Sequence, residues 1–472
     1  MSPTQVIEYE AVNASPVKSF FVSMLTRDIT LEEAILDLLD NCVDGILRIG
    51  PKASEHPYRD YHAEIEFDKD SFTISDNCGG IPWALHEYAF RMGRAKASPG
   101  ISRGSVGVYG IGMKRAIFKL GKHALISTQN KNHRYEVEIK PKWLNDQDDW
   151  TIPVEPMQQS MDHDGTTIVV GELYKNISER FSTDSDAFEN DLKRMVATHY
   201  AFIIDKGFSV KINRARVQPK PTRLIFTETS SHGRRVIQPY IFKTKTKDGV
   251  SVFLAVGFTR PIPSELEAVS SEQDSNYSSL DAGWTIVCND RAVLYCDRTE
   301  LTGWGEAGVP RYHNQFIAIS GIVEFTSADP SKLPTTTTKR GIDASSPLYL
   351  RVKNKMREGM LLFTDYTNKW KGRADESRKQ IGNGIAMPFD QLKDKSSKLR
   401  FRKIKSSVLA GEQYRPLLPM PAAVESSKRR ISFTKSAGEV RLLGEHLFED
   451  PDYDPSAIGE KCFDIVLREA RK

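Results

Sequence analysis

Residues 29–45 read ITLEEAILDLLDNCVDG and place five carboxylates and one amide where a single helix is expected. Asp37, Asn41 and Asp44 are spaced by four and three residues, so they share one face of that helix. An amide one turn after a carboxylate suits a magnesium–nucleotide site, because Mg²⁺ prefers oxygen ligands and the carboxylate can orient a water toward a phosphate. Taken alone, the same pattern also fits a solvated acidic face.

The pattern around these residues predicts the helix that positions them. Thr30 followed three residues later by Glu33 has the spacing of a capping box, in which each side chain satisfies a free N–H of the helix start. That spacing gives Glu33 a structural task and leaves the chemistry to Asp37. The apolar side chains that recur at helical spacing, and that we expect to face the core, are Ile35, Leu38, Leu39, Cys42 and Ile46.

A second motif, ISDNCGGIP at residues 74–82, follows a predicted hairpin. Residues 63–76 alternate apolar and polar side chains about a polar turn, as a β-hairpin does. Asp76 at its end could accept a hydrogen bond from an adenine amino group, and Gly79 and Gly80 allow the backbone to approach a planar base. An ordinary Asp-Asn/Gly turn is the alternative reading of this motif.

Two further motifs follow along the chain. Residues 107–114, GVYGIGMK, are a glycine-rich loop that opens a predicted helix over 113–120, and helix N-termini favour anions such as phosphate. This loop is neither a Walker A sequence nor a dinucleotide-binding fingerprint. A second hairpin is predicted over 123–140, and DGTTIVV at 164–170 predicts a strand that begins with Thr166.

In this order and spacing, the four motifs resemble the ATP site of the GHKL superfamily. Its members include type II topoisomerase ATPase subunits, MutL mismatch-repair proteins, the ninety-kilodalton heat-shock chaperones, histidine kinases and the MORC ATPases. The segments LLDNCVDG, FRMGRAK, VGVYGIGMKRAIFKLGKHALISTQ and GTTI look most like MORC-type ATPases. The resemblance implies an α+β fold, in which a GHKL (Bergerat) ATP-binding sandwich is followed by a transducer-like α/β domain and a small C-terminal helical region.

The resemblance implies a role for each matching residue. Asn41 would hold Mg²⁺, and Asp37, where MORC-like members usually carry Glu, would be the general base. Asp76 would bind the adenine amino group with support from Thr166. A lid over residues 93–112 would close on ATP, and Lys339 of the transducer-like domain would reach the γ-phosphate, with Arg340 as the alternative. The other implied ATP-binding residues are Gly80, Ile81, Gly107, Val108, Tyr109, Gly110, Ile111, Gly112, Met113 and Lys114.

The sequence departs from the family pattern at two positions. Cys78 replaces the first glycine of the usual Asp-x-Gly-x-Gly motif, a change that a small side chain tolerates. Asp37 is one methylene shorter than Glu, which withdraws the carboxylate by about 1.5 Å, and a misplacement of about 1 Å can lower a rate roughly 100-fold. Hydrolysis is therefore expected to be slow, unless a helix shift compensates, or ATP acts as a switch that is hardly hydrolysed.

Composition and charge set the wider expectations. The chain of 472 residues is 39% hydrophobic and 27% charged, with no apolar run long enough to span a bilayer, no signal-peptide pattern and five scattered cysteines. These features predict a soluble, cytoplasmic protein without a membrane partner. Residues 391–440 contain 12 Lys/Arg and 4 Asp/Glu, a formal +8 within a chain of net +4. That segment could bind a phosphate backbone or be a solvated linker.

The expected domains follow from the motifs and these charge shifts. They are an ATP-binding domain over 1–180, a transducer-like domain over 181–345, a helical extension over 346–390, a basic linker or nucleic-acid-binding segment over 391–440, and an acidic helical tail over 441–472.

The expected function is a Mg²⁺-dependent ATP-driven switch that pairs two N-terminal domains into a homodimeric clamp. It would act on DNA through residues 391–440 or beside a partner effector protein, as standalone relatives in antiviral defence do. The alternatives are a nucleotide-locked adaptor of weak activity, a chaperone-like member and a protein-kinase-like member. A kinase would need a phosphoacceptor histidine and usually an upstream sensor, and 472 residues is short for a chaperone.

Overall fold

The computed structural model describes residues 17–50, 54–92, 111–131, 133–228, 235–264, 267, 281–336, 341–381, 384–406, 408–421 and 431–471. Its mixed content of helices and antiparallel and mixed sheets agrees with the predicted α+β class. The chain forms two compact units, Met1–Pro421 and Ala422–Lys472. Within the described ranges, no helix combines the length and the apolar character needed to cross a membrane.

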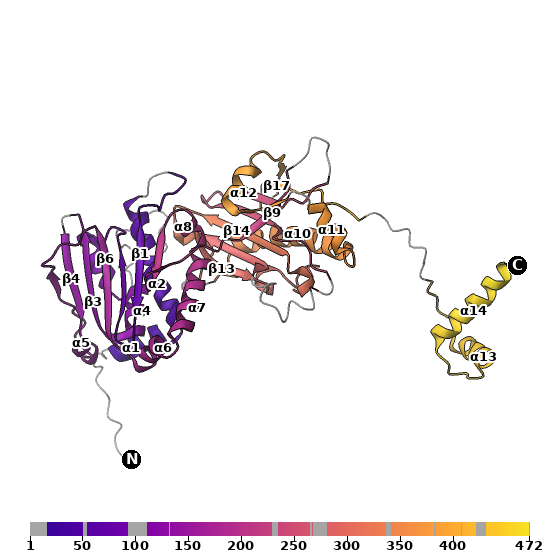
Figure 1. Cartoon of the computed structure of the whole chain (residues 1–472), viewed down its shortest axis with the longest axis horizontal. Coiled ribbons are helices and arrows are strands. Elements are labelled where there is room, and N and C mark those ends of the chain that lie inside the picture. Colours follow the sequence, from indigo (N-terminus) through magenta and orange to yellow (C-terminus); the bar gives the residue numbers. More distant parts are fainter. Residues whose placement is uncertain are drawn as a thin grey trace, which may run out of the picture. The chain divides into compact units, whose positions relative to one another are not determined.

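Among the described residues, the first sheet of the larger unit has eight strands in the order β5-β4-β3-β6-β2-β1-β7-β8 (Figure 1). Neighbouring strands are antiparallel except β1 and β7, which are parallel. Buried and more exposed side chains alternate along β2, so one face of the sheet packs on the core. The strands are β1 (His62–Phe67), β2 (Phe72–Asp76), β3 (Gly121–Asn130), β4 (His133–Ile139), β5 (Val154–Pro156), β6 (Gly165–Leu173), β7 (Ser209–Ile212) and β8 (Ala215–Arg216).

Helices cover the core face of this sheet, and α2 lies among them with most of its length buried (Figure 1). The predicted core stripe of α2 is confirmed, because all five of its apolar side chains are buried. The two hairpins predicted from alternation are also confirmed as β1–β2 and β3–β4. The helices are α1 (Lys18–Arg27), α2 (Leu31–Ile49), the short 3₁₀ helix η1 (Trp83–Leu85), α3 (His86–Phe90), α4 (Gly112–Leu120), α5 (Pro141–Asn145), α6 (Lys175–Ser182), α7 (Ser185–His199) and α8 (Ala201–Asp205).

The first sheet extends past the boundary that was expected at residue 180. β7 pairs with β1 in parallel, and β8 forms the outer strand beside β7. The side chains of Val210 and Ile212 on β7 are buried in the same core as α2. The chain up to about residue 217 therefore belongs with the first sheet, a correction that depends on strand pairing between residues about 150 positions apart.

The second sheet has, in the described residues, seven strands in the order β13-β12-β14-β11-β10-β17-β16. Only β12 and β14 are parallel neighbours. Nearly every residue of β11, β12 and β14 is buried, as expected for strands covered on both faces. The strands are β10 (Tyr240–Lys245), β11 (Ser251–Phe258), β12 (Gly283–Cys288), β13 (Arg291–Asp297), β14 (Ile319–Thr326), β16 (Arg402–Ile404) and β17 (Gly411–Tyr414).

Different elements bury the two faces of this second sheet. α10 packs on one face, where its Met356 and Met360 join the larger core cluster. On the other face, Phe202 of α8 and Phe389 of α12 pack against sheet side chains such as Ile241. The elements are α10 (Pro347–Lys369), α11 (Ala374–Ile381), α12 (Phe389–Ser396), the paired strands β9 (Arg223–Phe226) and β15 (Ile385–Pro388), and the 3₁₀ helices η4 (Glu300–Thr302), η5 (Asn314–Phe316) and η6 (Pro330–Lys332).

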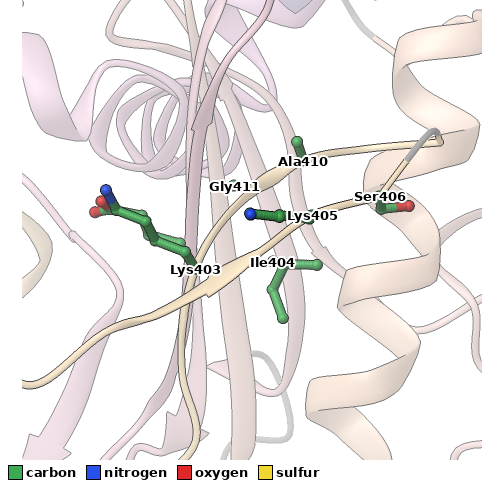
Figure 2. A pocket seen from close by; sticks show the side chains of 7 residues that line it. Lys403, Ile404, Lys405, Ser406, Ala410 and Gly411 are labelled. Atoms are coloured by element: carbon green, nitrogen blue, oxygen red, sulfur yellow. The ribbon is translucent and has the colours of Figure 1, made fainter.

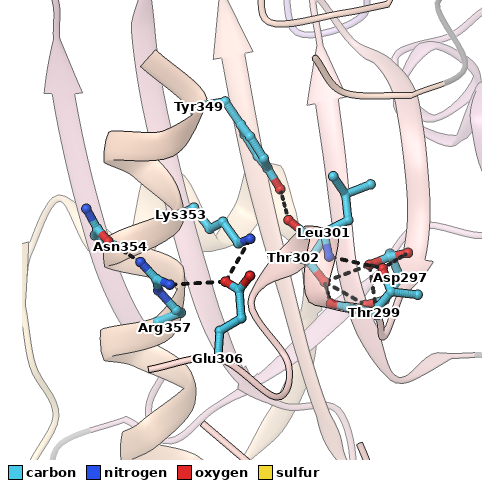
Figure 3. Close-up of polar contacts among 9 residues, drawn as sticks. All are labelled: Asp297, Thr299, Leu301, Thr302, Glu306, Tyr349, Lys353, Asn354 and Arg357. Carbon is cyan, nitrogen blue, oxygen red and sulfur yellow. Dashed lines mark hydrogen bonds and ion pairs between the residues drawn. The ribbon is translucent and has the colours of Figure 1, made fainter. Parts of the chain in front are cut away.

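Polar contacts fasten α10 to the loop that follows β13 (Figure 3). Lys353 Nζ and Arg357 Nη1 lie 2.8 and 3.1 Å from Glu306 Oε2. The Tyr349 hydroxyl donates to the Leu301 carbonyl at 2.7 Å. The helical extension expected over 346–390 is therefore not separate, because its main helix is one of the two layers that close the second sheet.

The expectation of a linker over residues 391–440 also needs correction for the first part of that segment. Within it, α12 continues to Ser396, β16 and β17 form the edge of the second sheet, and Leu418 is buried in the core. Residues 391–421 are therefore an integral part of the second sheet rather than a linker. Sequence patterns missed these strands because β17 pairs with β10, about 170 positions earlier in the chain.

The smaller unit contains two helices in its described residues, α13 (Ala437–Phe448) and α14 (Pro455–Ala470). Ser436 and Glu439 form a capping box at the start of α13. Ile458 of α14 is buried, and a Cβ added at Gly444 would lie 3.2 Å from its Cδ1 atom, which shows how closely the two helices approach. The helical tail expected over 441–472 corresponds to this helix pair.

Candidate functional site

The helix α2 begins as its sequence predicts. The Glu33 amide donates to Thr30 Oγ1 at 3.2 Å, and the Thr30 amide donates to Glu33 Oε2 at 2.9 Å, so the capping box is complete. The Glu33 side chain therefore caps the start of the helix. Of the three polar residues on the predicted site face, Asp37 is buried, Asn41 is exposed and Asp44 is partly exposed.

Asp37 lies where α2 meets the start of α4. A Cβ added at Gly112 would lie 3.5 Å from Asp37 Oδ2, so the first turn of α4 packs directly against this carboxylate. Arg115, one turn along α4, donates to Asp37 Oδ2 through both Nε and Nη2. A guanidinium held this way fixes the position of the carboxylate beside the first turn of α4.

Asp76 is buried at the end of β2, with 8% of its surface exposed. Its Oδ1 accepts from the Cys78 amide at 2.7 Å, and the Cys42 thiol lies 3.4 Å from its Oδ2. Burial raises the pKa of the Asp76 carboxyl, although these hydrogen bonds oppose the shift. Cys78, which stands at the usual glycine position, is thus accommodated inside the core and supplies its backbone amide to Asp76.

A threonine pair ties the end of β2 to the neighbouring strands. Asp76 faces Thr166 across the β2–β6 pairing, as the sequence predicted. Thr166 Oγ1 lies 3.1 Å from Thr128 Oγ1 on β3, and Thr128 Oγ1 also accepts from the Ile81 amide at 2.8 Å. Gly80 has φ +62°, and a Cβ added there would lie 2.0 Å from the Gln129 carbonyl oxygen, so this backbone conformation requires glycine.

The first turn of α4 lies against Asp37. Ile111 at the N-cap position makes no side-chain capping bond, so the amides of the first turn, including those of Gly112 and Met113, remain suited to an anion. The Lys114 side chain differs from expectation: it is buried and donates to the Ala89 carbonyl at 2.6 Å. Its ammonium group therefore holds α3 against α4. The backbone of Lys114 still lies in the first turn of α4, as the sequence predicted.

Several predicted residues lie outside the described residues. They are Gly107, Val108, Tyr109 and Gly110 of the glycine-rich loop, the part of the expected lid over 93–110, and Lys339 and Arg340 of the transducer-like domain. Their assignments stay predictions from the sequence. Among the described residues, the first turn of α4 at Gly112 packs on Asp37, Cys42 beside Asn41 contacts Asp76, and Asp76 pairs with Thr166. Thr128 links Thr166 to the Ile81 amide, next to Gly80. The assignment of Asn41, Ile111, Met113 and Lys114 to the nucleotide stays a prediction.

Sequence reasoning missed three residues that support the site. Arg115 holds Asp37, Thr128 links Thr166 to the Ile81 amide, and Cys42 lies beside Asp76. Arg115 follows directly after the glycine-rich motif and could have been noticed as a second cation there. No local pattern marks Thr128 or Cys42, because their partners are far away in the sequence.

The site offers few protein ligands for a metal ion. No cluster of three or more His, Cys, Asp or Glu side chains suited to a metal occurs among the described residues. Mg²⁺ is commonly held by one or two protein oxygens together with substrate phosphates. The exposed Asn41 carbonyl on α2, near the uncapped start of α4, fits that arrangement, whereas a cage built wholly from protein ligands would not.

A second feature of the larger unit is an open groove along the edge of the second sheet, which we name the basic groove. Two adjoining hollows of about 670 and 660 Å³ share Ala410, Gly411 and Glu412 of this edge. Figure 2 shows the hollow beside β16. The charged residues that line the groove are Lys243, Lys245, Lys393, Lys403, Lys405, Glu324 and Glu412.

The basic groove carries more cations than its carboxylates balance. Lys243 Nζ lies 3.1 Å from Glu412 Oε2, and Lys393 is paired with Glu324. Within the described part of the chain, the exposed side chains of Lys245, Lys403 and Lys405 take part in no ion pair. Part of the excess positive charge of residues 391–440 thus lies on exposed lysines at the edge of the second sheet.

Comparison with known proteins bears on the first of these two sites. Residues 29–168 match a family model described as "Histidine kinase-, DNA gyrase B-, and HSP90-like ATPase". The match spans α2, β2, α4 and the start of β6, and so includes the first three motifs and residues 164–168 of the fourth. It supports the GHKL resemblance and suggests ATP binding, without distinguishing MORC-type members from other branches. A search of curated proteins found no match to the chain.

Proposed function

We propose that this protein is a Mg²⁺-dependent ATP-binding and hydrolysing conformational switch. The observation that carries the proposal is the meeting of Asp37, exposed Asn41 and the uncapped start of α4, with Asp76 buried nearby, inside the segment that matches a GHKL-type family model. These are a carboxylate, an amide oxygen and the backbone amides of a helix start, which are groups that can act on the phosphates of a nucleotide.

Each residue has a task in the proposed reaction. Asp76 accepts a hydrogen bond from the adenine amino group, and the Thr128–Thr166 pair keeps the end of β2 in register. The first amides of α4 bind phosphate oxygens. Asn41 would hold Mg²⁺, which would neutralise charge on the phosphates.

Asp37 would orient a water for attack on the γ-phosphorus. The bond between the γ-phosphorus and the bridging oxygen breaks, ADP leaves with that oxygen, and the Asp37 carboxylate accepts the proton of the water. Arg115 holds the Asp37 side chain in place before the reaction. Because Asp is shorter than the Glu usual in MORC-like relatives, we expect slow turnover.

The switch would work through closure. ATP binding would close the predicted lid over 93–112 and allow two N-terminal domains to pair, with Lys339 reaching the γ-phosphate from the second domain. The MORC-like resemblance supports this clamp, and a partner effector protein could use it.

A nucleotide-locked adaptor is the second candidate, and the observation that favours it is the Arg115–Asp37 pair, because a carboxylate engaged by two guanidinium nitrogens is less available to a water.

An ATPase assay on the intact chain tests the proposal. We expect Mg²⁺-dependent phosphate release, slow in the wild-type protein and faster in Asp37→Glu, since the added methylene restores the reach of the carboxylate. DNA should stimulate the release if the clamp closes on it. Tight ATP binding without release in either protein would favour the adaptor, and phosphate label that stays on the protein would favour a kinase.

The basic groove supports DNA as the partner. Replacing its three unpaired lysines, as Lys245→Gln/Lys403→Gln/Lys405→Gln, should weaken duplex binding about tenfold at low salt. Each lost phosphate contact also lowers the slope of log affinity against log salt by about 0.9, so the triple variant should lose up to about 2.7 of that slope. Fluorescence anisotropy on a labelled duplex over a salt series measures both quantities.

A charge-matched variant of the first domain is the control for this prediction. Lys69→Gln/Lys122→Gln/Lys142→Gln removes the same charge from exposed positions around the first sheet, and it should leave the salt slope unchanged. Equal losses in both variants would show that only net charge matters. Substitution is a sharper test than deletion of 391–440, because deletion would also remove β16, β17 and most of α12 from the fold.

A further inference from the structure

The hairpin formed by β12 and β13 belongs to the second sheet but ends against α2 of the first domain. Its turn consists of Asn289 and Asp290, with φ angles of 48° and 65°. Successive left-handed residues are typical of a two-residue hairpin turn. Arg291 follows the turn as the first residue of β13 and is 1% exposed. We name residues 289–292 the hairpin tip.

Arg291 of the hairpin tip forms a buried ion pair with Asp40 of α2. Arg291 Nε donates to Asp40 Oδ1 at 2.8 Å, and the Tyr200 hydroxyl lies 2.5 Å from the same oxygen. The guanidinium carbon of Arg291 lies 4.4 Å from the centroid of the Tyr200 ring. Burial by itself would lower the pKa of Arg291, but the Asp40 carboxylate and Tyr200 outweigh it and raise the pKa, so Arg291 stays charged.

Other contacts hold the hairpin tip without touching α2. Lys206 Nζ lies 2.6 Å from Asp290 Oδ1, and the Tyr58 hydroxyl donates to Asp290 Oδ2 at 3.0 Å. His199 Nδ1 lies 2.7 Å from the Ala292 carbonyl oxygen. The tip is therefore fixed to the first domain at several points, and of these the Arg291 contact reaches the helix that carries the proposed nucleotide site.

We propose that Arg291 is a positioning residue for that site, because through Asp40 it holds the turn of α2 that carries Asn41 and so links the second sheet to nucleotide binding. The inference rests on the proposed function. Asp40 and Asn41 are successive residues, about 100° apart around the helix, so one faces the hairpin tip while the other faces the nucleotide. A shift of α2 on nucleotide binding moves both together, and a buried charge pair resists separation.

The coupling has a reciprocal consequence. If nucleotide at Asn41 stabilises one position of α2, the same position must stabilise the hairpin tip, and anything that displaces the tip must weaken nucleotide binding by the same factor. In this arrangement the second sheet, which also carries the basic groove, is linked to the ATP site through a specific pair of side chains, Asp40 and Arg291.

The test compares two double variants with the wild-type chain. Removing one partner alone would leave a buried unpaired charge, so Asp40→Leu/Arg291→Met removes both charges and replaces them with apolar groups. Lys206→Met/Asp290→Asn is the matched control, because it removes an ion pair of the same hairpin tip that does not contact α2. Arg291→Lys keeps the buried charge and serves as the conservative variant.

Two measurements are made on each protein: the Kd for Mg²⁺–ATP and amide hydrogen exchange of residues 283–297 with and without Mg²⁺–ATP. In the wild type and the control, nucleotide should slow exchange of the hairpin about tenfold, within the usual range of coupling between sites. Asp40→Leu/Arg291→Met should lose this slowing and bind ATP about tenfold more weakly, while its melting temperature stays near that of the wild type. Arg291→Lys should retain part of the slowing.

The outcomes separate this inference from the proposed function. ATP binding by the wild type with no change in hairpin exchange, or full slowing in Asp40→Leu/Arg291→Met, would overturn the role of Arg291 and leave the ATP site standing. Equal loss of slowing in the Lys206→Met/Asp290→Asn control would show that Arg291 has only a structural part in anchoring the tip. Failure of the wild type to bind Mg²⁺–ATP would overturn both proposals.

Discussion

Replacing Asp37 with asparagine is expected to lower the rate of phosphate release by about 100-fold to 10,000-fold, the range in which a positioned general base contributes. The amide cannot accept a proton from water. It keeps the size of the carboxylate, and its carbonyl oxygen can still accept from Arg115, so the contact between α2 and α4 should persist. The Kd for ATP should change by less than about threefold, because Asp37 acts on the water and not on the nucleotide.

Single-turnover phosphate release and calorimetric ATP binding measure the two effects separately. Asp44→Asn is the matched control, because Asp44 lies on the same face of α2 but about two turns further along, roughly 10 Å by helical rise. That variant should hydrolyse ATP at the wild-type rate. If Asp37→Asn turns over ATP normally, another acid is the base and the assignment of Asp37 is wrong.

Replacing Asn41 with alanine is expected to weaken Mg²⁺–ATP binding by at least about 100-fold, which corresponds to about 2.8 kcal/mol. Asn41 is the residue of α2 that we propose as the protein ligand of Mg²⁺, and alanine offers no oxygen in its place. The side chain is exposed, so the melting temperature of the protein without nucleotide should hardly change. Titration calorimetry with Mg²⁺ and again with a chelator measures the affinity.

Two comparisons make the Asn41 result specific to the metal. Chelation should weaken ATP binding by the wild type to nearly the level of Asn41→Ala, and it should have little further effect on the variant. Asn41→Asp keeps an oxygen ligand and should retain most of the Mg²⁺ dependence. Wild-type affinity in Asn41→Ala, in the presence of Mg²⁺, would refute the placement of the site on this face of α2.

Local sequence patterns were sufficient for the elements that surround the site. The Thr30–Glu33 spacing predicted the start of α2, and alternation predicted the hairpins β1–β2 and β3–β4. The resemblance to the GHKL superfamily implied that Thr166 lies beside Asp76, and the two residues are paired across β2 and β6. These features depend on residues close together in the chain or on a motif shared with a known superfamily. Periodicity and capping act over a few residues, which is why a single sequence contains them.

Contacts between residues far apart in the chain could not be predicted from the sequence. Neither the pairing of Asp37 with Arg115 nor that of Asp40 with Arg291 has a local signature, since the partners are 78 and 251 positions apart. The Lys114 side chain shows the same limit, because its charge suggested phosphate while its burial directs it to the Ala89 carbonyl. Which charge meets which depends on how the elements pack, and packing involves the whole chain.

The sequence by itself determined the helix, the two hairpins, the glycine turn at residues 79–80 and the order of motifs that resembles a GHKL-type nucleotide site, because these depend on local spacing. The tertiary structure alone decided that α4 brings Arg115 to Asp37, that β16 and β17 make the basic stretch part of a sheet, and that Arg291 meets Asp40. The physical reason is that buried charges and edge strands acquire partners only when distant segments pack together.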